Sequence, residues 1–402
     1  MKEYEVAIIG GGFSGLVAAI VLSERFGGEN IAVFERNDRV GKKILATGNG
    51  RGNISNLSLT AEHYHSAGEK TNAVNAIEKY GYKSIIGFFY NLGIPVVYEG
   101  ERIYPSSLQA SSVLDMMRVK LDFLKTDIKT NSECEEIKKI SCGFSVLTKS
   151  GEYFAKRVVF AAGGKAGKQY GTDGKAFGIL EKFGVKITPL FPAIVQLKTD
   201  TTYLKGLKGL KEKATVKAFD GDKFLSEFYG DVLFTDYGVS GNAVFYLSSY
   251  LVGAKNPEIS LSFTDKTEGD LFDFLSQKVK SMPYISSDDI LTGVINKQIG
   301  RAIGRRCEAN DLSERSIRKI AVCAKDFRLK VAGTLGFDYA QVTRGGVNLD
   351  EVTEDLELKK IGGFFVTGEA LDIDGDCGGY NLQWAYSSAM TVAEKISASK
   401  QS

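Results

Sequence analysis

A glycine-rich turn between an apolar strand and a helix constrains the fold more than any other feature of the sequence. EYEVAIIGGGFSGLVAAIVLSERFGG has an apolar run over 6–9, then Gly10, Gly12 and Gly15, then helical periodicity. This is GxGxxG in its strand–turn–helix context, where the glycines permit a tight turn and close approach of the backbone to a pyrophosphate. The helix start also offers unpaired N–H groups to phosphates. The pattern predicts an α/β chain that begins with a dinucleotide-binding fold.

An acidic residue follows at the spacing that such folds use. The second apolar strand, IAVF, ends at Glu35, twenty residues after Gly15. A carboxylate there can accept hydrogen bonds from both hydroxyls of an adenosine ribose. Strand, helix, second strand and acid together favour a bound dinucleotide over an ordinary glycine-rich turn. Both FAD and NAD fit, whereas Glu35 would repel the 2′-phosphate of NADP.

The loop after this acid, GKKILATGNGRGNISN over 41–56, is poor in apolar side chains, and we expect neither helix nor strand there. Its glycines allow close approach to a ligand, and its amides can hydrogen-bond polar edges. This segment is either a solvated turn or a loop that runs along an extended FAD. We favour the loop along FAD. Lys42 and Lys43 are expected near the phosphates, and Arg51 and Asn53 near the isoalloxazine.

The middle of the chain predicts further elements of a large FAD-binding fold. A helical stretch covers 73–92, and EEIKKISCGFSVLTKSGEYFAKRVVFAAGG resembles three short antiparallel strands before an apolar strand. That last strand ends in Gly163 and Gly164. A β-meander crossover of this kind suits an FAD domain better than a simple NAD domain. A second glycine pair normally lies near the adenosine end of FAD.

Periodicity changes divide the chain into five segments. Residues 191–264 alternate polar and apolar side chains, which predicts a small β-barrel or sandwich, and 265–330 have the helical period of a small cap. Strand-like fragments such as AQVTRGGV return over 331–346. The FAD-binding domain is then formed by 1–190 and 347–402. The insert is either structural bulk or a substrate domain.

The C-terminal segment supplies the second half of the predicted site. GGFFVTGEALDIDGDCGGYNLQWAYSS contains a strand over 363–367, then Glu369 and Asp372, a glycine-rich turn, and a helix from about Leu382. A carboxylate at the strand's end can accept bonds from ribityl hydroxyls. N–H groups at the helix start can face flavin N1 and O2, where negative charge accumulates on reduction.

Composition excludes several other classes of protein. The 51 basic and 49 acidic residues among 402 nearly balance, which argues against a nucleic-acid partner. No apolar run approaches the length of a membrane span, and the N-terminus lacks the pattern of a signal peptide, so we expect a cytoplasmic protein without a membrane partner. The cysteines contain no CxxC pair and suit a reducing compartment. The two histidines, His63 and His65, are expected in a solvated loop, and no metal site is expected.

Five segments resemble one known family. ATGNGRGNISN, GERIYPSSLQA, LFTDYGVSG, VTRGGV and GEALDIDGDCGGYNLQWAYSS are similar to the BaiN-like, or aminoacetone-oxidase-like, family of FAD-dependent oxidoreductases. The resemblance implies a two-segment Rossmann-like FAD domain, an inserted β-barrel domain, a small helical cap and non-covalent FAD. The sequence departs from the family at Gly52, often Cys, at Asn242, often Pro, and at Ala389, often Gly. These departures leave FAD binding intact and the substrate open.

The candidate cofactor-binding residues come from both ends of the chain and from its middle. They are Gly10, Gly12, Phe13, Ser14, Gly15, Glu35, Arg36, Lys42, Lys43, Gly48, Asn49, Gly50, Arg51, Asn53, Cys134, Ala162, Gly163, Gly164, Gly368, Glu369, Asp372, Gly379, Tyr380, Asn381 and Leu382. No side chain is a convincing catalytic acid or base. A charge-transfer thiol at Cys377 is less favoured than a packing role, because a lowered thiol pKa needs a nearby cation. Three tyrosines either line the substrate face or pack in the core or pocket wall: Tyr104, Tyr237 and Tyr380.

Two functions follow as expectations. The first is hydride transfer between FAD and a small organic substrate, with NAD(P)H or oxygen as the other redox partner. The second is a flavoprotein that works by binding, as a redox sensor or as a component of RNA modification. The single dinucleotide fingerprint is assigned to FAD, so any NAD(P)H is expected to bind weakly at the flavin face.

Overall fold

The computed structural model describes residues 2–398, so the ends of the predicted segments at Met1 and 399–402 lie outside the described residues. The chain forms two compact units. We call Met1–Pro192 with Gln341–Ser402 the two-segment unit, and Ala193–Ala340 the inserted unit. Within residues 2–398, no helix has the length and apolar character needed to cross a membrane.

A mixed sheet forms the centre of the two-segment unit. Its strand order is β7-β2-β1-β10-β9-β8, and β19 also pairs with β10. The strands are β1 (Glu3–Ile9), β2 (Ile31–Phe34), β7 (Asp127–Lys129), β8 (Cys134–Ile140), β9 (Gly143–Thr148), β10 (Gly151–Phe160) and β19 (Phe364–Val366). The neighbours β7, β2, β1, β10 and β19 pair in parallel, as in a Rossmann-type sheet. The strands β1 and β2 have the near-continuous apolar runs of parallel strands buried on both faces.

The meander differs from its prediction in one respect. The third antiparallel strand and the apolar strand that follows it are one strand, β10. Its first half pairs antiparallel with β9, and its apolar second half continues in parallel between β1 and β19. No turn signal separates the two halves in the sequence, in agreement with the continuous strand.

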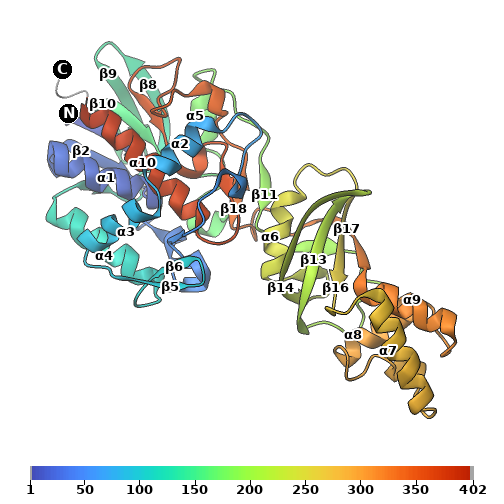
Figure 1. Cartoon of the computed structure of the whole chain (residues 1–402). Coiled ribbons are helices and arrows are strands. Elements are labelled where there is room, and N and C mark those ends of the chain that lie inside the picture. Colours follow the sequence, from blue (N-terminus) through green and yellow to red (C-terminus); the bar gives the residue numbers. More distant parts are fainter. Residues whose placement is uncertain (1, 399–402) are drawn as a thin grey trace. The chain divides into compact units, whose positions relative to one another are not determined.

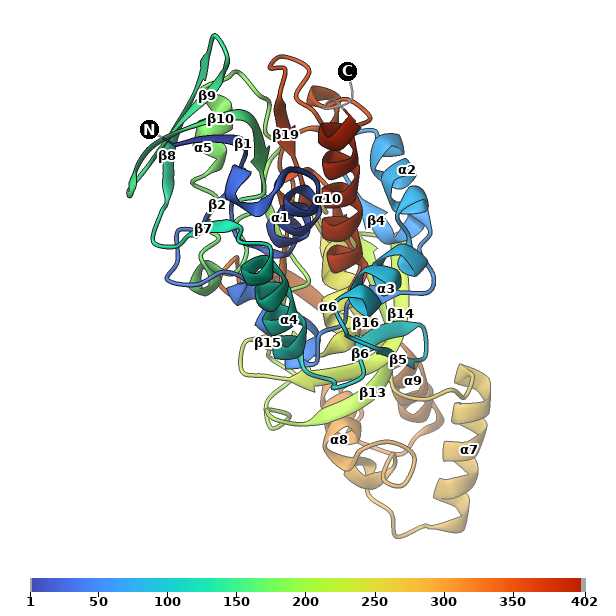
Figure 2. The same cartoon turned by 90° about the vertical axis from the view of Figure 1, so that its left-hand side faces the viewer.

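The helices of this unit pack on the central sheet, on one another or on the smaller elements of the unit. They are α1 (Phe13–Phe26), α2 (Thr71–Lys79), α3 (Tyr82–Asn91), α4 (Ala110–Phe123), α5 (Phe177–Glu181) and α10 (Tyr380–Ala398). The first and last helices, α1 and α10, lie side by side (Figures 1 and 2). The predicted single helix over 73–92 is interrupted at Tyr80 and Gly81, where the backbone leaves the helical region.

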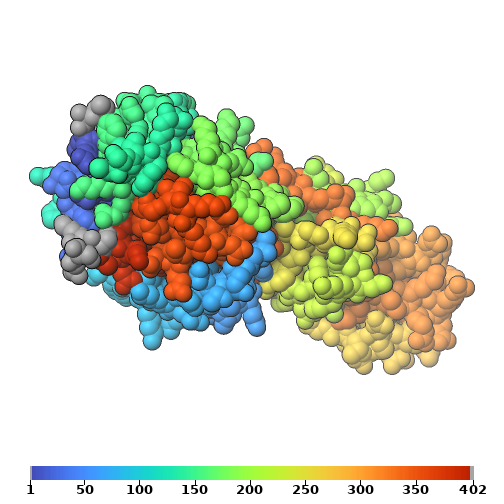
Figure 3. All heavy atoms as spheres, turned by 90° about the horizontal axis from the view of Figure 1, so that it is seen from above, coloured from blue at the N-terminus to red at the C-terminus, as the bar shows by residue number. Residues whose placement is uncertain are grey.

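The two ends of the chain share one hydrophobic core in this unit. In the space-filling view, the red and orange C-terminal segment lies between blue and green parts of the first segment (Figure 3). Small sheets add to the unit: β3 (Ser55–Asn56), β6 (Arg102–Pro105) and β5 (Val96–Glu99); β4 (Tyr64–His65) with β20 (Asp374–Gly375); and β11 (Phe191–Ala193) with β18 (Val342–Arg344). Segments far apart in sequence therefore form one body.

The inserted unit is a closed antiparallel barrel with helices. Its strand order is β12-β15-β14-β13-β16-β17, and β12 closes the barrel on β17. The elements are β12 (Leu197–Thr199), β13 (Lys211–Asp220), β14 (Lys223–Phe234), β15 (Gly238–Ser240), α6 (Asn242–Tyr250), β16 (Pro257–Ser262), α7 (Glu268–Ser281), α8 (Lys297–Arg306), α9 (Glu314–Lys325) and β17 (Phe327–Thr334). One hydrophobic core joins barrel and helices.

Two predicted segment boundaries are corrected. The return strand β17 begins at Phe327, inside the segment 265–330 predicted as a cap. The fragment QVTRGGV, predicted within a barrel segment over 331–346, belongs to the two-segment unit from Gln341 onward. Short apolar stretches between turns do not say which sheet they join, and here β17 pairs with β16 while β18 pairs with β11.

Short 3₁₀ helices connect these elements. They are η1 (Gly28–Asn30), η2 (Lys42–Gly50), η3 (Ala61–His63), η4 (Lys168–Tyr170), η5 (Ser287–Asp289), η6 (Leu349–Glu351) and η7 (Gly368–Ala370). Three of them, η2, η3 and η7, carry residues of the site described next.

Candidate functional site

The glycine turn brings the end of β1 against the start of α1. A Cβ atom on Gly15 would lie 2.1 Å from the carbonyl oxygen of Gly10, and one on Gly10 would lie 2.4 Å from that of Ala161. These two glycines are therefore required by the packing of the chain itself. Gly12 differs, because a Cβ there would meet nothing within 4 Å. It is the N-cap of α1 and makes no side-chain capping bond, so N–H groups of the first turn remain available to an anion.

The carboxylate of Glu35 is fixed at the end of β2. Its Oε2 accepts a hydrogen bond of 2.9 Å from the backbone N–H of Gly11, and its Oε1 accepts bonds from the backbone and side-chain amides of Asn37. The residue is buried. Each carboxylate oxygen can accept more than one hydrogen bond, so capacity remains for ribose hydroxyls.

A cavity of about 380 Å³ lies beside Glu35. Five other predicted site residues line it: Gly10, Arg36, Cys134, Ala162 and Gly164. Arg36 forms ion pairs of 3.0 Å with Glu133 and 2.9 Å with Asp173, both on the cavity wall. Burial raises the pKa of the Cys134 thiol to about 12, so this side chain is a neutral wall residue. The structure thus groups these five residues with the acid that the sequence placed at the adenosine end.

The loop over 41–56 is more regular than predicted. Residues Lys42–Gly50 form 3₁₀ turns, interrupted at Thr47, Gly48 and Asn49. The expectation of neither helix nor strand was wrong for most of this stretch, because Ile44 packs into the core and anchors a helical turn. Gly48 and Asn49 have the positive φ values that the glycine and asparagine content indicated.

The basic residues of this loop have different partners. Lys43 Nζ lies 2.7 Å from Glu369 and 3.1 Å from the carbonyl oxygen of Ala166. Lys42 pairs with Asp38 on the surface. Arg51 pairs with Glu99 and lies over the ring of Tyr104, 4.7 Å from its centroid. Of these three basic side chains, Lys43 is the one that pairs with the C-terminal segment in the described residues.

Glu369 links three segments of the two-segment unit. Besides Lys43, it accepts a 3.0 Å hydrogen bond from the backbone N–H of Thr343. The hydroxyl of Thr343 in turn accepts bonds of 2.8 Å from the N–H groups of Lys165 and Ala166. A Cβ on Gly164 would lie 2.4 Å from this hydroxyl. Sequence reasoning missed Thr343, although it lies in the VTRGGV motif.

Two buried oxygen atoms in this unit lack a partner among the described residues: Oδ1 of Asn53 and Oδ1 of Asp372. A Cβ on Gly379 would lie 2.8 Å from the first of them. Oδ2 of Asp372 accepts a 3.1 Å bond from the N–H of Ala67, and burial raises the pKa of this carboxyl above its ordinary value. Since buried polar atoms are normally hydrogen-bonded, these two fit a bound molecule rich in hydroxyl and N–H groups, as FAD is.

The start of α10 is held by its own side chains. Asn381 accepts a 2.8 Å bond from the N–H of Gly375 and donates a 2.7 Å bond to its carbonyl oxygen. Gly368 has φ +69°, and a Cβ there would lie 2.6 Å from Ser14 Oγ, which brings the predicted residues of the first and last segments together. Phe13 instead stacks on Phe89 in the core.

The remaining predicted site residues of these segments have ordinary surroundings. Gly50 and Gly163 have positive φ values of the kind that favours glycine. Leu382 packs against the hydrophobic core. Burial raises the pKa of the Cys377 thiol, while nearby Arg102 acts in the opposite direction. A thiol held protonated in this way packs rather than acting as a charge-transfer thiolate.

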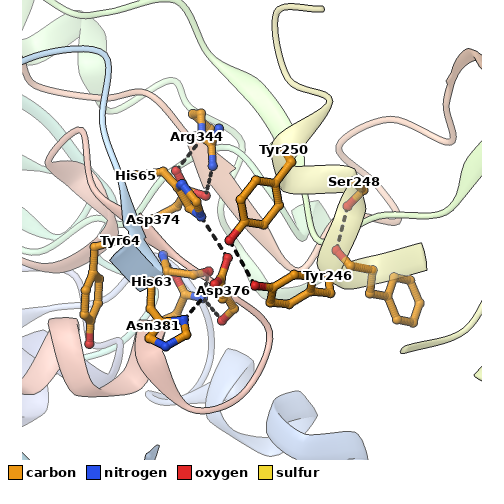
Figure 4. Close-up of polar contacts among 12 residues, drawn as sticks. His63, Tyr64, His65, Tyr246, Ser248, Tyr250, Arg344, Asp374, Asp376 and Asn381 are labelled. Carbon is orange, nitrogen blue, oxygen red and sulfur yellow. Dashed lines mark hydrogen bonds and ion pairs between the residues drawn. The ribbon is translucent and has the colours of Figure 1, made fainter. Parts of the chain in front are cut away.

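The expectation that the two histidines lie in a solvated loop is wrong. Nδ1 of His63 lies 3.0 Å from Oδ2 of Asp376, and Nε2 of His65 lies 2.8 Å from Oδ1 of the same carboxylate (Figure 4). Asp376 is completely buried. The stretch Tyr64–His65 is the strand β4, which pairs with β20, and the strand brings the histidines onto the carboxylate. The only sequence signal for this arrangement was that a single residue separates His63 from His65.

The ring of His63 also stacks on the ring of Tyr380, with centroids 4.5 Å apart. Beside this group, Arg344 forms bonds of 2.7 and 2.9 Å with the buried carboxylate of Asp374 (Figure 4). Burial still raises the pKa of Asp374 above its ordinary value, against the effect of the guanidinium. In the part of the chain that the structure describes, no group of three or more histidine, cysteine or acidic side chains could hold a metal ion.

The Rossmann-type sheet, the glycine turn at α1 and the acid at the end of β2 define a dinucleotide-binding fold. The family model described as "HI0933-like protein Rossmann domain" matches residues 4–395, and the chain belongs to this family. Together with the curated relatives below, this makes the protein an FAD-dependent oxidoreductase.

Two curated relatives match nearly the whole chain. The chain is 35% identical over 393 residues to a 3-dehydro-bile acid delta(4,6)-reductase of Clostridium scindens, covering 95% of this chain and 96% of the relative. It is 28% identical over 412 residues to a ribosomal RNA dihydrouridine synthase of Haemophilus influenzae, covering 99% of this chain and 100% of the relative.

A solved structure supports the fold. The 3-ketosteroid-delta4-(5alpha)-dehydrogenase of Rhodococcus jostii RHA1 superposes with a TM-score of 0.54 at 14% identity, covering 97% of this chain and 96% of that one. At this identity the likeness concerns the fold alone.

Proposed function

We propose that this protein is an FAD-dependent reductase that adds a hydride to a carbon–carbon double bond conjugated to a carbonyl group. The observation that carries the proposal is that two full-length relatives with unlike substrates share this bond type. The name of the bile acid reductase denotes a ketone whose carbonyl group is conjugated with ring double bonds. The name of the second denotes saturation of the uridine double bond beside a ring carbonyl. Such a bond accepts a hydride at the carbon remote from the carbonyl, because the carbonyl stabilises the resulting negative charge.

The residues of the two-segment unit fit the cofactor in order along its length. The first turn of α1 would take the pyrophosphate, and Glu35 the adenosine ribose. The unpartnered oxygens of Asp372 and Asn53 would accept bonds from the ribityl chain and from the flavin ring. Bound FAD, once reduced, supplies the hydride. The protein holds the other parts of FAD and thereby orients the flavin ring.

NAD(P)H is the proposed source of that hydride. The sequence has one GxGxxG strand–turn–helix fingerprint, and FAD takes it. NAD(P)H would therefore bind transiently at the flavin face, without a cradle of its own. We expect a KM for NADH or NADPH towards the upper end of the usual ~1 μM to 1 mM span.

The same reaction on a uracil base in RNA is the second candidate. The observation that favours it is coverage: the dihydrouridine synthase relative matches 99% of this chain and all of its own length. The balanced charge of the chain argues against it, since RNA-binding proteins generally carry a basic excess. The two candidates share the bond reduced and differ in the molecule that carries it.

The test is an anaerobic two-step experiment. The flavin is reduced with NADH, NADPH or dithionite and then mixed with a 3-oxo-Δ4 steroid, with cyclohex-2-enone, or with an unmodified ribosomal RNA transcript. We expect rapid flavin reoxidation and a product heavier by two hydrogens with at least one of them. If the reduced flavin is reoxidised only after oxygen is admitted, and no acceptor gives a product, the proposal is contradicted.

A further inference from the structure

We propose that His63 is the proton donor of this reaction and that Asp376 positions it. The inference rests on the proposed function, because reduction of a conjugated double bond needs a proton as well as a hydride. When the β-carbon receives the hydride, the electron pair of the double bond moves to the α-carbon. A new C–H bond forms there as the N–H bond at Nε2 of His63 breaks. The flavin is oxidised, the substrate is reduced, and solvent returns the proton to the imidazole.

The geometry of His63 suits a proton donor. Its Nδ1 lies 3.0 Å from Oδ2 of Asp376, a carboxylate that is completely buried. A carboxylate at one ring nitrogen fixes the tautomer and stabilises the protonated ring, as in catalytic Asp–His pairs. The side chain of His63 is 25% exposed, and its Nε2 has no hydrogen-bond partner among the described residues. The nitrogen that would give the proton is therefore not engaged within the described part of the chain.

His65 keeps the carboxylate in place. Its Nε2 bonds to Oδ1 of Asp376 at 2.8 Å, so each histidine occupies a different oxygen. Such sharing means that the charge on one ring affects the other through one carboxylate. We assign His65 a positioning role.

Other charged and titratable groups lie around the pair, among them Arg102, which acts on the neighbouring Cys377 thiol. Arg344 and Asp374 neutralise each other. Burial raises the pKa of the Cys377 thiol, and raises that of the Tyr64 phenol well above its ordinary value, so both are neutral at physiological pH. Two more groups belong to the surroundings: the phenol of Tyr380, and Lys70, whose Nζ bonds to the backbone oxygen of Tyr64.

The location of the pair also fits the role. His63 stacks on Tyr380, the first residue of α10, and the turn before this helix has Gly379 against the unpartnered Oδ1 of Asn53. The sequence places flavin N1 and O2 at the start of α10, and the proposed function gives the neighbouring Asn53 oxygen to the ribityl chain or the flavin ring. A proton donor is needed at that end and not at the adenosine end.

A first experiment reads the rings directly, without turnover. The chain has only two histidines, so ¹⁵N NMR of the untagged full chain shows two imidazoles. We expect neutral His63 to carry its hydrogen on Nδ1, and its ¹⁵N chemical shifts to change both in Asp376→Asn and in His65→Gln. The second variant keeps the test valid if the first fails to fold. A hydrogen on Nε2, or ¹⁵N chemical shifts of His63 unaffected by either variant, overturns the proposal.

A second experiment separates proton donation from structural support. Dithionite-reduced enzyme is mixed anaerobically with cyclohex-2-enone. In His63→Gln we expect flavin reoxidation to slow about 100-fold, in the usual range for loss of general acid catalysis, with unchanged FAD content and flavin reduction rate. Added imidazole should restore part of the rate. Glu62→Gln, an exposed neighbour in η3, is the matched control and should behave as wild type.

The outcomes are distinct. If His63→Gln lowers the melting temperature but reoxidises at the wild-type rate, the histidine only joins β4 to its neighbours and the inference is wrong. If the wild-type enzyme reduces neither an enone nor an RNA uracil, the proposed function is wrong and this role falls with it. If His63→Gln is slow and imidazole restores the rate, the inference is supported.

Discussion

The two ends of the candidate site each contain a buried carboxylate, but the two are held differently. Glu35 accepts bonds from the amides of Gly11 and Asn37, which are near it in the first segment. Asp376 accepts bonds from His63 and His65, more than 300 residues away in sequence. The first arrangement uses backbone amides of a local motif, and the second needs the fold to bring two side chains to one carboxylate. The proposed adenosine end is thus locally determined, and the proposed flavin end is determined by tertiary structure.

The largest effect that tests this comparison is expected at the glycine turn. Gly15→Ala should destabilise the two-segment unit by about 3 kcal/mol, because the new methyl group overlaps the carbonyl oxygen of Gly10. The purified protein should also be colourless. Chemical denaturation and the flavin absorbance measure the two effects.

Gly12→Ala is the matched control for this change. A Cβ at Gly12 meets no atom of the protein, so the apoprotein should keep its stability. If Gly12 faces the pyrophosphate, FAD affinity should still fall. Equal destabilisation by the two substitutions would contradict the assignment of one glycine to packing and the other to the ligand.

The next effect is expected at Glu35. Glu35→Ala removes an ionised acceptor from the ribose and should weaken FAD binding by roughly 1.5–3 kcal/mol, or about tenfold to a hundredfold. It should change the spectrum of the remaining bound flavin little, since the flavin ring lies at the other end. Titration of the apoprotein with FAD measures the affinity. An unchanged dissociation constant would mean that another residue binds the ribose.

The contrast between the ends also explains how much the sequence could predict. The GxGxxG turn and Glu35 follow from spacing within one βαβ unit, and the structure places both at one edge of the sheet. The β-barrel was predicted as barrel or sandwich from alternation alone, because closure depends on the pairing of β12 with β17. His63 and Thr343 could not be predicted, since each acts through a partner hundreds or tens of residues away.

A smaller effect is expected at Asp372, where stability and binding should change in opposite directions. Asp372→Asn removes a buried charge and should stabilise the apoprotein at pH 7 by on the order of 1 kcal/mol. FAD affinity should fall by roughly tenfold or less, because the amide accepts hydrogen bonds more weakly. Denaturation of the apoprotein and FAD titration measure the two quantities. Loss of stability at pH 7 would show that the carboxylate holds the fold and not the ligand.

The pH dependence of this variant has a definite sign. Burial raises the pKa of Asp372 in the folded protein, so the native state binds a proton more readily than the unfolded state. The contribution of Asp372 to the stability of the wild-type apoprotein therefore decreases as the pH rises above about 4. The advantage of Asp372→Asn should be present at pH 7 and should disappear below about pH 4, where the carboxyl is protonated in both states.

The smallest effect is expected at Arg51, where the sequence and the structure point in different directions. The sequence placed Arg51 near the isoalloxazine, but its guanidinium pairs with Glu99, and both side chains are partly exposed. Such surface pairs contribute about 0–1 kcal/mol. Lys43, which the sequence placed nearer the phosphates, instead pairs with Glu369 from the C-terminal segment. We therefore expect Arg51→Ala to leave the flavin reduction rate within about twofold of wild type, and Lys43→Met to lower FAD affinity more. Stopped-flow reduction of the two variants side by side is the measurement. A large rate loss in Arg51→Ala alone would show that the arginine leaves Glu99 when FAD binds, and that the sequence located it correctly.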